Sequence, residues 1–118
     1  MHFSISFTKL AIILSLALSA SCFVQKSGVV GFSYWQTGHA FEVGNGSRSD
    51  LRYVTFAGAF AGYPTVVLSI KSLDSSKSYN LRINTEAIGV SPTGFGLNVY
   101  TWADTKIYGV TISWIAYL

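Results

Sequence analysis

Cysteine, histidine and charged side chains are all scarce in this sequence. Cys22 is the single cysteine, the two histidines are His2 and His39, and charged residues make up 11% of the chain. One cysteine cannot form an internal disulfide, and so small an inventory excludes a Cys–His catalytic pair and a histidine-rich metal cluster. The five acidic residues show no spacing that suggests the paired carboxylates of a glycosidase. We therefore expect no enzyme, no metal and no cofactor.

The positive charge of the chain is small and dispersed. Eight basic residues against five acidic ones give a formal net charge of +3. The basic residues form no cluster that could follow a phosphate backbone, so nucleic acid is not an expected partner. A length of 118 residues leaves room for one domain.

The N-terminal segment has the pattern of a secretory signal. The stretch from Leu10 to Leu18 is apolar except for Ser15, and small residues follow it. That apolar run is too short to span a bilayer, which needs roughly 20 apolar residues. We expect residues 1–22 to be a cleaved signal peptide, residues 23–118 to be the domain, and the protein to be secreted. A lipoprotein signal, with lipid on Cys22, is disfavoured because Ser19 stands where a large aliphatic residue is usual.

No sustained helical period follows Cys22, whereas alternation of apolar and polar residues recurs. Segments rich in Gly, Pro, Asn, Asp and Ser separate the alternating stretches. This pattern predicts an all-β fold, a six-stranded antiparallel β-sandwich, preceded by the signal peptide. The expected strands are Val29–Trp35, Leu51–Phe56, Thr65–Ser72, Asn80–Ile88, Thr93–Trp102 and Ile107–Leu118.

Two details of these strands bear on function. In the stretch 80–88, Leu81, Ile83 and Ala87 share one face, which places Arg82 on the opposite, polar face. Gly94-Phe95-Gly96 lies inside a strand pattern and predicts a bulge or close packing, not a phosphate-binding loop.

The C-terminal half carries a specific succession of short stretches. It includes Asn80-Leu81-Arg82, then 90–95 (Val-Ser-Pro-Thr-Gly-Phe), Tyr100-Thr101-Trp102 and Ile112-Ser113-Trp114. This succession resembles the H-type lectin family, that is, the snail egg agglutinins and the C-terminal domains of discoidins. The resemblance implies a trimer, or a hexamer of two trimers, that binds galactose-type sugars, above all N-acetylgalactosamine, near the seams between protomers.

The resemblance also implies a carbohydrate-binding site. The family positions that match Arg82, Trp102 and Tyr108 contact the sugar. The chemistry of these residues agrees, because an aromatic ring can cover the C–H face of a sugar and an arginine fork can donate to two hydroxyls. Read without the family, Arg82 could equally be a solvated strand residue and Trp102 a core or interface residue.

The sequence departs from the snail pattern at two positions of that site. Ala103 stands where the agglutinin has a sugar-contacting His. Counting back from Phe56 without gaps places Asn45 at the position of a loop Asp that grips the sugar. Small shifts would bring Gly44 or Gly46 there, and a larger shift Asp50. Asn45-Gly46-Ser47 is also a glycosylation sequon.

The missing framework cysteines are a further departure, since Val99 and Ala61 occupy two of their positions. Any trimer would therefore be held by non-covalent packing. The expected function is multivalent recognition of glycans or agglutination. The alternative is a structural or protein-interaction module that keeps the sandwich and has lost sugar binding.

Overall fold

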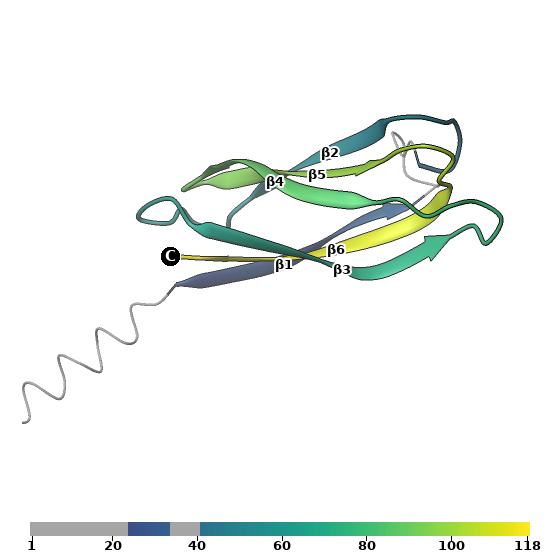
Figure 1. Ribbon diagram of the computed structural model, residues 1–118. Helices are drawn as coiled ribbons and strands as arrows, with labels where there is room; N and C mark the ends of the chain where they lie inside the picture. The colour runs from purple at the N-terminus through teal and green to yellow at the C-terminus, as the bar shows by residue number, and fades with distance from the viewer. Residues whose placement is uncertain (1–23, 34–40) are drawn as a thin grey trace, which may run out of the picture.

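Six β-strands form two antiparallel sheets that pack face to face, which confirms the predicted sandwich (Figure 1). The computed structural model describes residues 24–33 and 41–118. One sheet, here the β6 sheet, has the order β1–β6–β3, and the other, the β5 sheet, has the order β2–β5–β4. The strands are β1 (Gln25–Ser33), β2 (Arg48–Thr55), β3 (Thr65–Ser75), β4 (Asn84–Ser91), β5 (Gly94–Thr101) and β6 (Ile107–Tyr117). The expected signal peptide and His39 lie outside the described residues.

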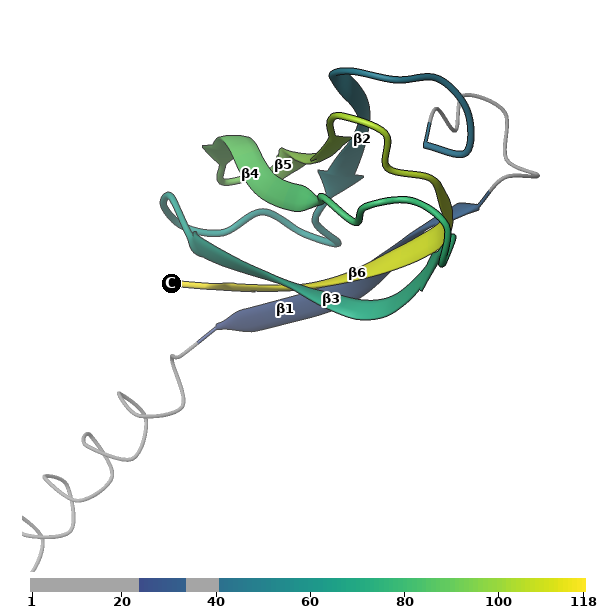
Figure 2. The same cartoon turned by 45° about the vertical axis from the view of Figure 1, so that its right-hand side comes forward.

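The connections of the sandwich run mostly between its two sheets. Among the described strands, β4 and β5 alone are consecutive in the chain and paired in one sheet. The strands β1, β3 and β5 all finish at the end of the sandwich where β6 begins (Figures 1 and 2). Chain segments that are distant in sequence therefore meet at that end.

The predicted strand limits need correction at several places. The strand expected from Asn80 begins only at Asn84, so Arg82 lies in an extended segment ahead of β4, and Leu81 is exposed rather than buried. The physical reason is that threonine side chains, and not a neighbouring strand, hold the backbone of residues 80–82. The strand expected from Val29 starts four residues earlier, because its pairing with β6 continues to Tyr117.

The remaining limits shift by fewer residues. β2 begins at Arg48 rather than Leu51, and β3 continues to Ser75 through two irregularities in its pairing with β6. The close packing predicted around Gly94 is confirmed, because a Cβ at this position would clash with the carbonyl oxygen of Val54.

Aromatic rings fill the space between the sheets. The ring of Phe95 on β5 lies 5.6 Å from the ring of Trp114 on β6, edge to face, and Phe56 contacts both. Edge-to-face and tilted pairs of this kind add about 0.5–1.5 kcal/mol each beyond the area they bury. The buried apolar core consists of Phe32, Phe41, Phe56, Phe60, Phe95, Leu97, Val99, Ile107, Val110, Ile112, Trp114 and Ala116.

Gly28 on β1 makes room for the core tryptophan, and this provides a test of the packing. Its partner in the β-ladder is Trp114, and a Cβ at Gly28 would lie 2.7 Å from the indole Nε1. We expect Gly28→Ala to destabilise the fold by about 1–3 kcal/mol, the usual cost of overpacking a core. Thermal or urea melts measure the effect.

Gly31 on the same strand is the matched control. A Cβ there meets only the Thr111 hydroxyl, at 3.9 Å. Gly31→Ala should leave stability unchanged or raise it by up to about 1 kcal/mol, because alanine loses less backbone entropy than glycine. Equal destabilisation by both substitutions would contradict the packing described here.

Candidate functional site

Three chain segments meet at the end of the sandwich where β6 begins: the loop 41–47, the segment 79–83 and the turn 102–106. The Gly46 amide donates to the Ala103 carbonyl at 2.8 Å, and the Ile107 amide donates to the Phe41 carbonyl at 2.9 Å. The Lys106 ammonium donates to the Gly44 carbonyl. The loop ahead of β2 is thus tied to the turn ahead of β6.

Arg48 strengthens this tie from the first position of β2. Its guanidinium donates to the carbonyl oxygens of Val43 (3.0 Å) and Gly46 (3.1 Å) on one side. It also donates to those of Thr105 (2.9 Å) and Ala103 (3.2 Å) on the other. Because the guanidinium is planar and charged, one side chain can hold four carbonyls in a fixed arrangement. Arg48 therefore sets the shape of the loop that contains Asn45.

Two buried threonines attach the Arg82 segment to the same turn. The Thr105 hydroxyl accepts from the Arg82 amide at 2.9 Å and donates to the Asn80 carbonyl at 2.7 Å. The Thr101 hydroxyl donates to the Arg82 carbonyl. Both threonines are fully buried, and buried hydroxyls are stable only when they are hydrogen-bonded. They bring the backbone of Arg82 next to the turn that begins with Trp102.

Four of the side chains predicted to bind sugar are exposed at this end. Trp102 is 38% and Tyr108 40% exposed, and Arg82 and Asn45 are also open to solvent. The indole of Trp102 lies beside the ring of Tyr100, with 6.1 Å between the ring centres. The part of the chain that the structure describes offers no hydrogen bond or ion pair to the Arg82 guanidinium.

A shallow hollow lies beside Trp102, and we refer to it as the Trp102 hollow. Its volume is about 260 Å³, and its walls come from β2 and β5. Arg82 and Tyr108 are not among its lining residues. The structure thus places Trp102 at the hollow, and Arg82 and Tyr108 at the same end of the sandwich but outside the hollow. The lining residues are Ser47, Arg48, Ser49, Tyr100, Thr101 and Trp102.

Asp50, the other candidate for the missing loop aspartate, lies elsewhere. It sits within β2, is 12% exposed, and accepts two hydrogen bonds from Arg52 at 3.0 and 3.2 Å. The Arg52 guanidinium in turn covers the ring of Phe32 at 4.8 Å. The carboxylate of Asp50 is therefore engaged in an ion pair inside the fold.

Ala103 adopts an unusual backbone conformation directly after Trp102. Its φ is +58°, in the left-handed region that residues other than glycine adopt rarely. This conformation turns the chain sharply so that the Ala103 carbonyl can accept from both Gly46 and Arg48. The side chain itself, a methyl group, offers no hydrogen bond to a ligand.

Sequence reasoning missed Arg48, Thr101, Thr105 and Tyr100. Thr101, which stands between Tyr100 and Trp102, is the one available signal, because a threonine buried among aromatic side chains needs a hydrogen-bond partner. Nothing in the local pattern indicates that the partner is residue 82. In residues 24–33 and 41–118, no group of three acidic, His or Cys side chains could hold a metal, and no helix is long and apolar enough to span a membrane.

A β-sandwich with an exposed tryptophan, a shallow hollow and an exposed arginine at one end defines a small binding module. The chain belongs to the H-type lectin family, since residues 51–117 match the H-type lectin domain. The fold is therefore that of a carbohydrate-binding domain. The match begins beyond the loop that contains Asn45.

Individual relatives agree with this membership. The protein described as ATP synthase subunits region ORF 7 of Fuscovulum blasticum is 33% identical over 101 residues, which cover 86% of this chain and 88% of that protein. A discoidin-1 chain of Dictyostelium discoideum is 31% identical over 78 residues, or 65% of this chain. The wild-type discoidin II structure from the same organism aligns over 83% of this chain with a TM-score of 0.72 and 25% identity. The matched region is only 31% of the length of that discoidin-1 chain and 37% of discoidin II.

Removal of the Arg48 guanidinium tests the organisation of this end. We expect Arg48→Met to lower the free energy of unfolding by about 2 kcal/mol, since hydrogen bonds from a charged group are lost. Hydrogen exchange of the Gly46 amide should become faster, because the loop is no longer held against the turn. Lys71→Met, an exposed change on β3, is the control and should leave both values unchanged. Unaltered exchange at Gly46 in Arg48→Met would refute the role assigned to Arg48.

Proposed function

We propose that the protein is a secreted lectin for terminal galactose or N-acetylgalactosamine, with its site at the Trp102 end of the sandwich. The observation that carries the proposal is the partly exposed indole of Trp102 beside a hollow of about 260 Å³, with the exposed Arg82 anchored to the same turn. Such a site suits a neutral ring with one apolar face and several hydroxyls.

Each residue has a distinct part in this proposal. Trp102, supported by Tyr100, provides an aromatic surface for the C–H face of the sugar. The Arg82 fork donates to two neighbouring hydroxyls, and the threonine bonds to its backbone limit where the fork can lie. Tyr108 adds a ring and a hydroxyl, and Asn45 a side-chain amide that can both donate and accept. Asp50 is a supporting residue, because its carboxylate is committed to Arg52.

The trimer that the family resemblance implies requires an outer face on which copies of this chain can pack. The outer face of the β6 sheet carries four apolar side chains that are 38–52% exposed: Val29, Val67, Ile115 and Tyr117. Ladder pairing places Ile115 directly between Ser27 and Val67, and Ser113 between Val29 and Ser69. A flat apolar face with small serines between its larger side chains is suited to close packing against copies of itself. Several weak sites on one particle then give avidity.

The rival function is a protein-interaction module without sugar binding. Ala103 favours this rival, because a methyl group stands where the family has a histidine. Asn45 also favours it, because an amide stands where the family has a carboxylate. The retained Arg82, Trp102 and Tyr108 favour the lectin. A wild-type protein that binds no sugar in calorimetric titration decides for the interaction module.

The arginine substitution Arg82→Ala tests the proposed site. The side chain is exposed and the backbone is held by Thr101 and Thr105, so the fold should persist. Affinity for N-acetylgalactosamine should fall by about 1.5–3 kcal/mol per site, the value of hydrogen bonds to a charged group. That corresponds to roughly tenfold to more than a hundredfold in Kd. Calorimetric titration measures the loss, and thermal melts verify the fold.

Lys71→Ala serves as the charge-matched control and should bind as the wild type does. Trp102→Ala should also abolish binding. An Arg82→Ala protein that melts normally and binds as tightly as the wild type would place the site elsewhere.

Assembly gives a separate test of the outer face of the β6 sheet. Light scattering should report a trimer or hexamer that resists reducing agents, since one cysteine per chain can link at most two protomers. Ile115→Asp should yield monomers, because a charge in the middle of a buried face is strongly unfavourable. Tyr63→Asp, a change at an exposed loop residue, should leave the oligomer intact. A monomeric wild type at micromolar concentration would rule out the trimer.

A further inference from the structure

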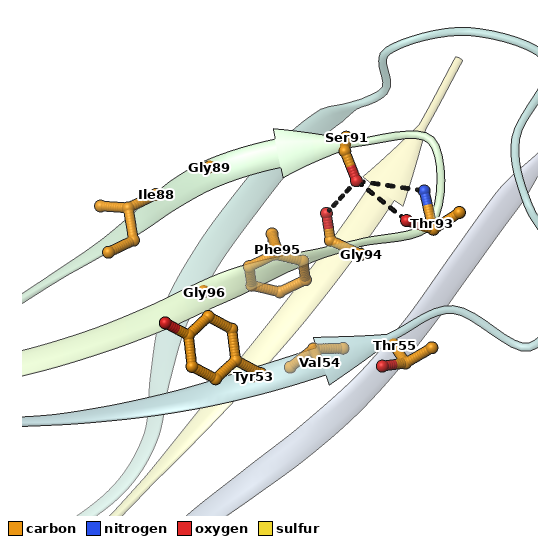
Figure 3. A pocket seen from close by; sticks show the side chains of 10 residues that line it. All are labelled: Tyr53, Val54, Thr55, Ile88, Gly89, Ser91, Thr93, Gly94, Phe95 and Gly96. Atoms are coloured by element: carbon orange, nitrogen blue, oxygen red, sulfur yellow. Dashed lines mark hydrogen bonds between the residues drawn. The ribbon is translucent and has the colours of Figure 1, made fainter.

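A second hollow lies on the outer face of the β5 sheet, near the turn between β4 and β5 (Figure 3). We call it the Tyr53 trough. Its volume is about 370 Å³, within the roughly 300–1,000 Å³ of small-molecule sites. It shares no lining residue with the Trp102 hollow. Gly96 and Trp102 are six positions apart in the chain, which is about 20 Å at the rise of a strand.

The trough exists because the central strand of this sheet has no side chains there. Gly94 and Gly96 both face outward on β5, and a side chain at Gly94 would clash with the Val54 carbonyl. The floor of the trough is therefore backbone at Gly94. In the ladder, Tyr53 of β2 and Ile88 of β4 stand opposite Gly96 on its two sides. Gly96 itself is buried, because the side chains of Ile88 and Leu51 lie over it. Tyr53 and Ile88 thus flank the trough at its Gly96 end (Figure 3).

Tyr53 is the most notable of the walls, since 80% of its surface is exposed. A tyrosine this open on a sheet gains little from packing within the fold. Its ring faces the trough and its hydroxyl has no hydrogen-bond partner among the described residues (Figure 3). An open aromatic ring at the side of a shallow trough is a surface on which a ligand ring can stack.

The hydroxyl groups at the far end of the trough have defined donor and acceptor roles. The Ser91 hydroxyl donates to the Gly94 carbonyl at 3.2 Å, which uses its single hydrogen. The hydrogen in the 3.1 Å contact between the Ser91 and Thr93 hydroxyls must then come from Thr93. The Thr93 hydroxyl is left with free lone pairs, so toward a ligand it is an acceptor. Thr55, also on the rim, can both donate and accept.

We propose that the Tyr53 trough is a second carbohydrate site that binds one neutral hexopyranose unit. Its lining residues carry no ionised side chain, which disfavours phosphates, sulfated sugars and other charged ligands. A wholly apolar ligand would cover the hydroxyls of Thr93 and Thr55 without bonding to them, which costs free energy. A pyranose matches both parts: its C–H face stacks on Tyr53, and one of its hydroxyls donates to Thr93. Each protomer then offers two separate sugar sites.

Nuclear magnetic resonance can observe the two sites separately in the full-length domain. Galactose, N-acetylgalactosamine, glucose and mannose are titrated singly into labelled protein at millimolar concentrations. The amide signals of Gly89, Gly94 and Gly96 report on the trough, and the indole signal of Trp102 reports on the other site. At least one sugar should shift the three glycine signals in a saturable manner. Tyr53→Ala should weaken that response about tenfold and leave the Trp102 response unchanged.

Matched variants distinguish failure of this proposal from failure of the proposed lectin site. Thr93→Val, which removes the acceptor at constant shape, should also weaken the glycine response, whereas Tyr63→Ala, an equally open tyrosine outside the trough, should not. Arg82→Ala should abolish the Trp102 response alone. The second site is overturned if no sugar shifts the glycine signals, or if these signals shift equally in Tyr53→Ala. This conclusion holds whether or not the indole signal of Trp102 responds. A change of oligomeric state in Tyr53→Ala, seen by light scattering, would make the trough an interface and overturn it as well.

Discussion

The two sheets of the sandwich meet through four aromatic rings, and the remaining structure is built around this contact. Phe95 from the β5 sheet and Trp114 from the β6 sheet stand edge to face, while Phe56 and Phe60 close the cluster from the connection after β2. A domain of this size has a small core, and this chain cannot add an internal disulfide. Close packing of large rings therefore provides the connection between sheets, and it requires glycine opposite Trp114 at position 28.

Because the core occupies the middle of the sandwich, its ends are free to carry binding groups. At the end where β6 begins, the order comes from hydrogen bonds rather than from apolar packing. Arg48 gathers four carbonyls from two loops, and Thr101 with Thr105 holds the backbone on both sides of Arg82. Groups that are fixed before a ligand arrives lose less entropy on binding. Such an arrangement suits a shallow site that must bind a small ligand through its hydroxyls.

The outer faces of the two sheets differ in a way that fits different partners. The β6 sheet presents valine, isoleucine and tyrosine side chains among small serines, a surface suited to protein packing. The β5 sheet presents tyrosine and hydroxyl groups around a central strand that has glycines at positions 94 and 96. Under the proposals made above, the first face assembles the particle and the second adds sugar sites to it. Multivalent binding then depends on how both faces are used, since avidity grows with the number of sites that a rigid particle holds.

The sequence alone was sufficient for the sandwich and for the family. Alternation of apolar and polar residues is a local property, because neighbouring side chains of a strand point to opposite faces whatever the strand pairs with. It located all six strands, and the stretches around Arg82, Pro92, Trp102 and Trp114 carried the family resemblance that the domain match confirms. The alternation gave a wrong strand boundary where that boundary depends on pairing with a neighbouring strand, as at residues 80–83.

The architecture of the sites was decided only in three dimensions. Arg48 meets carbonyls 55 and 57 residues away, and Thr105 meets Arg82 at a separation of 23. No local pattern encodes such pairings, since they arise from which loops the crossing connections bring to one end. Likewise, the sequence predicts only an irregular or closely packed strand at Gly94 and Gly96. The trough there becomes apparent only in the structure, which places Tyr53 and Ile88 beside this strand. Periodicity assigns a residue to a face, whereas the neighbours on that face are set by the order and register of strands that are distant in the chain.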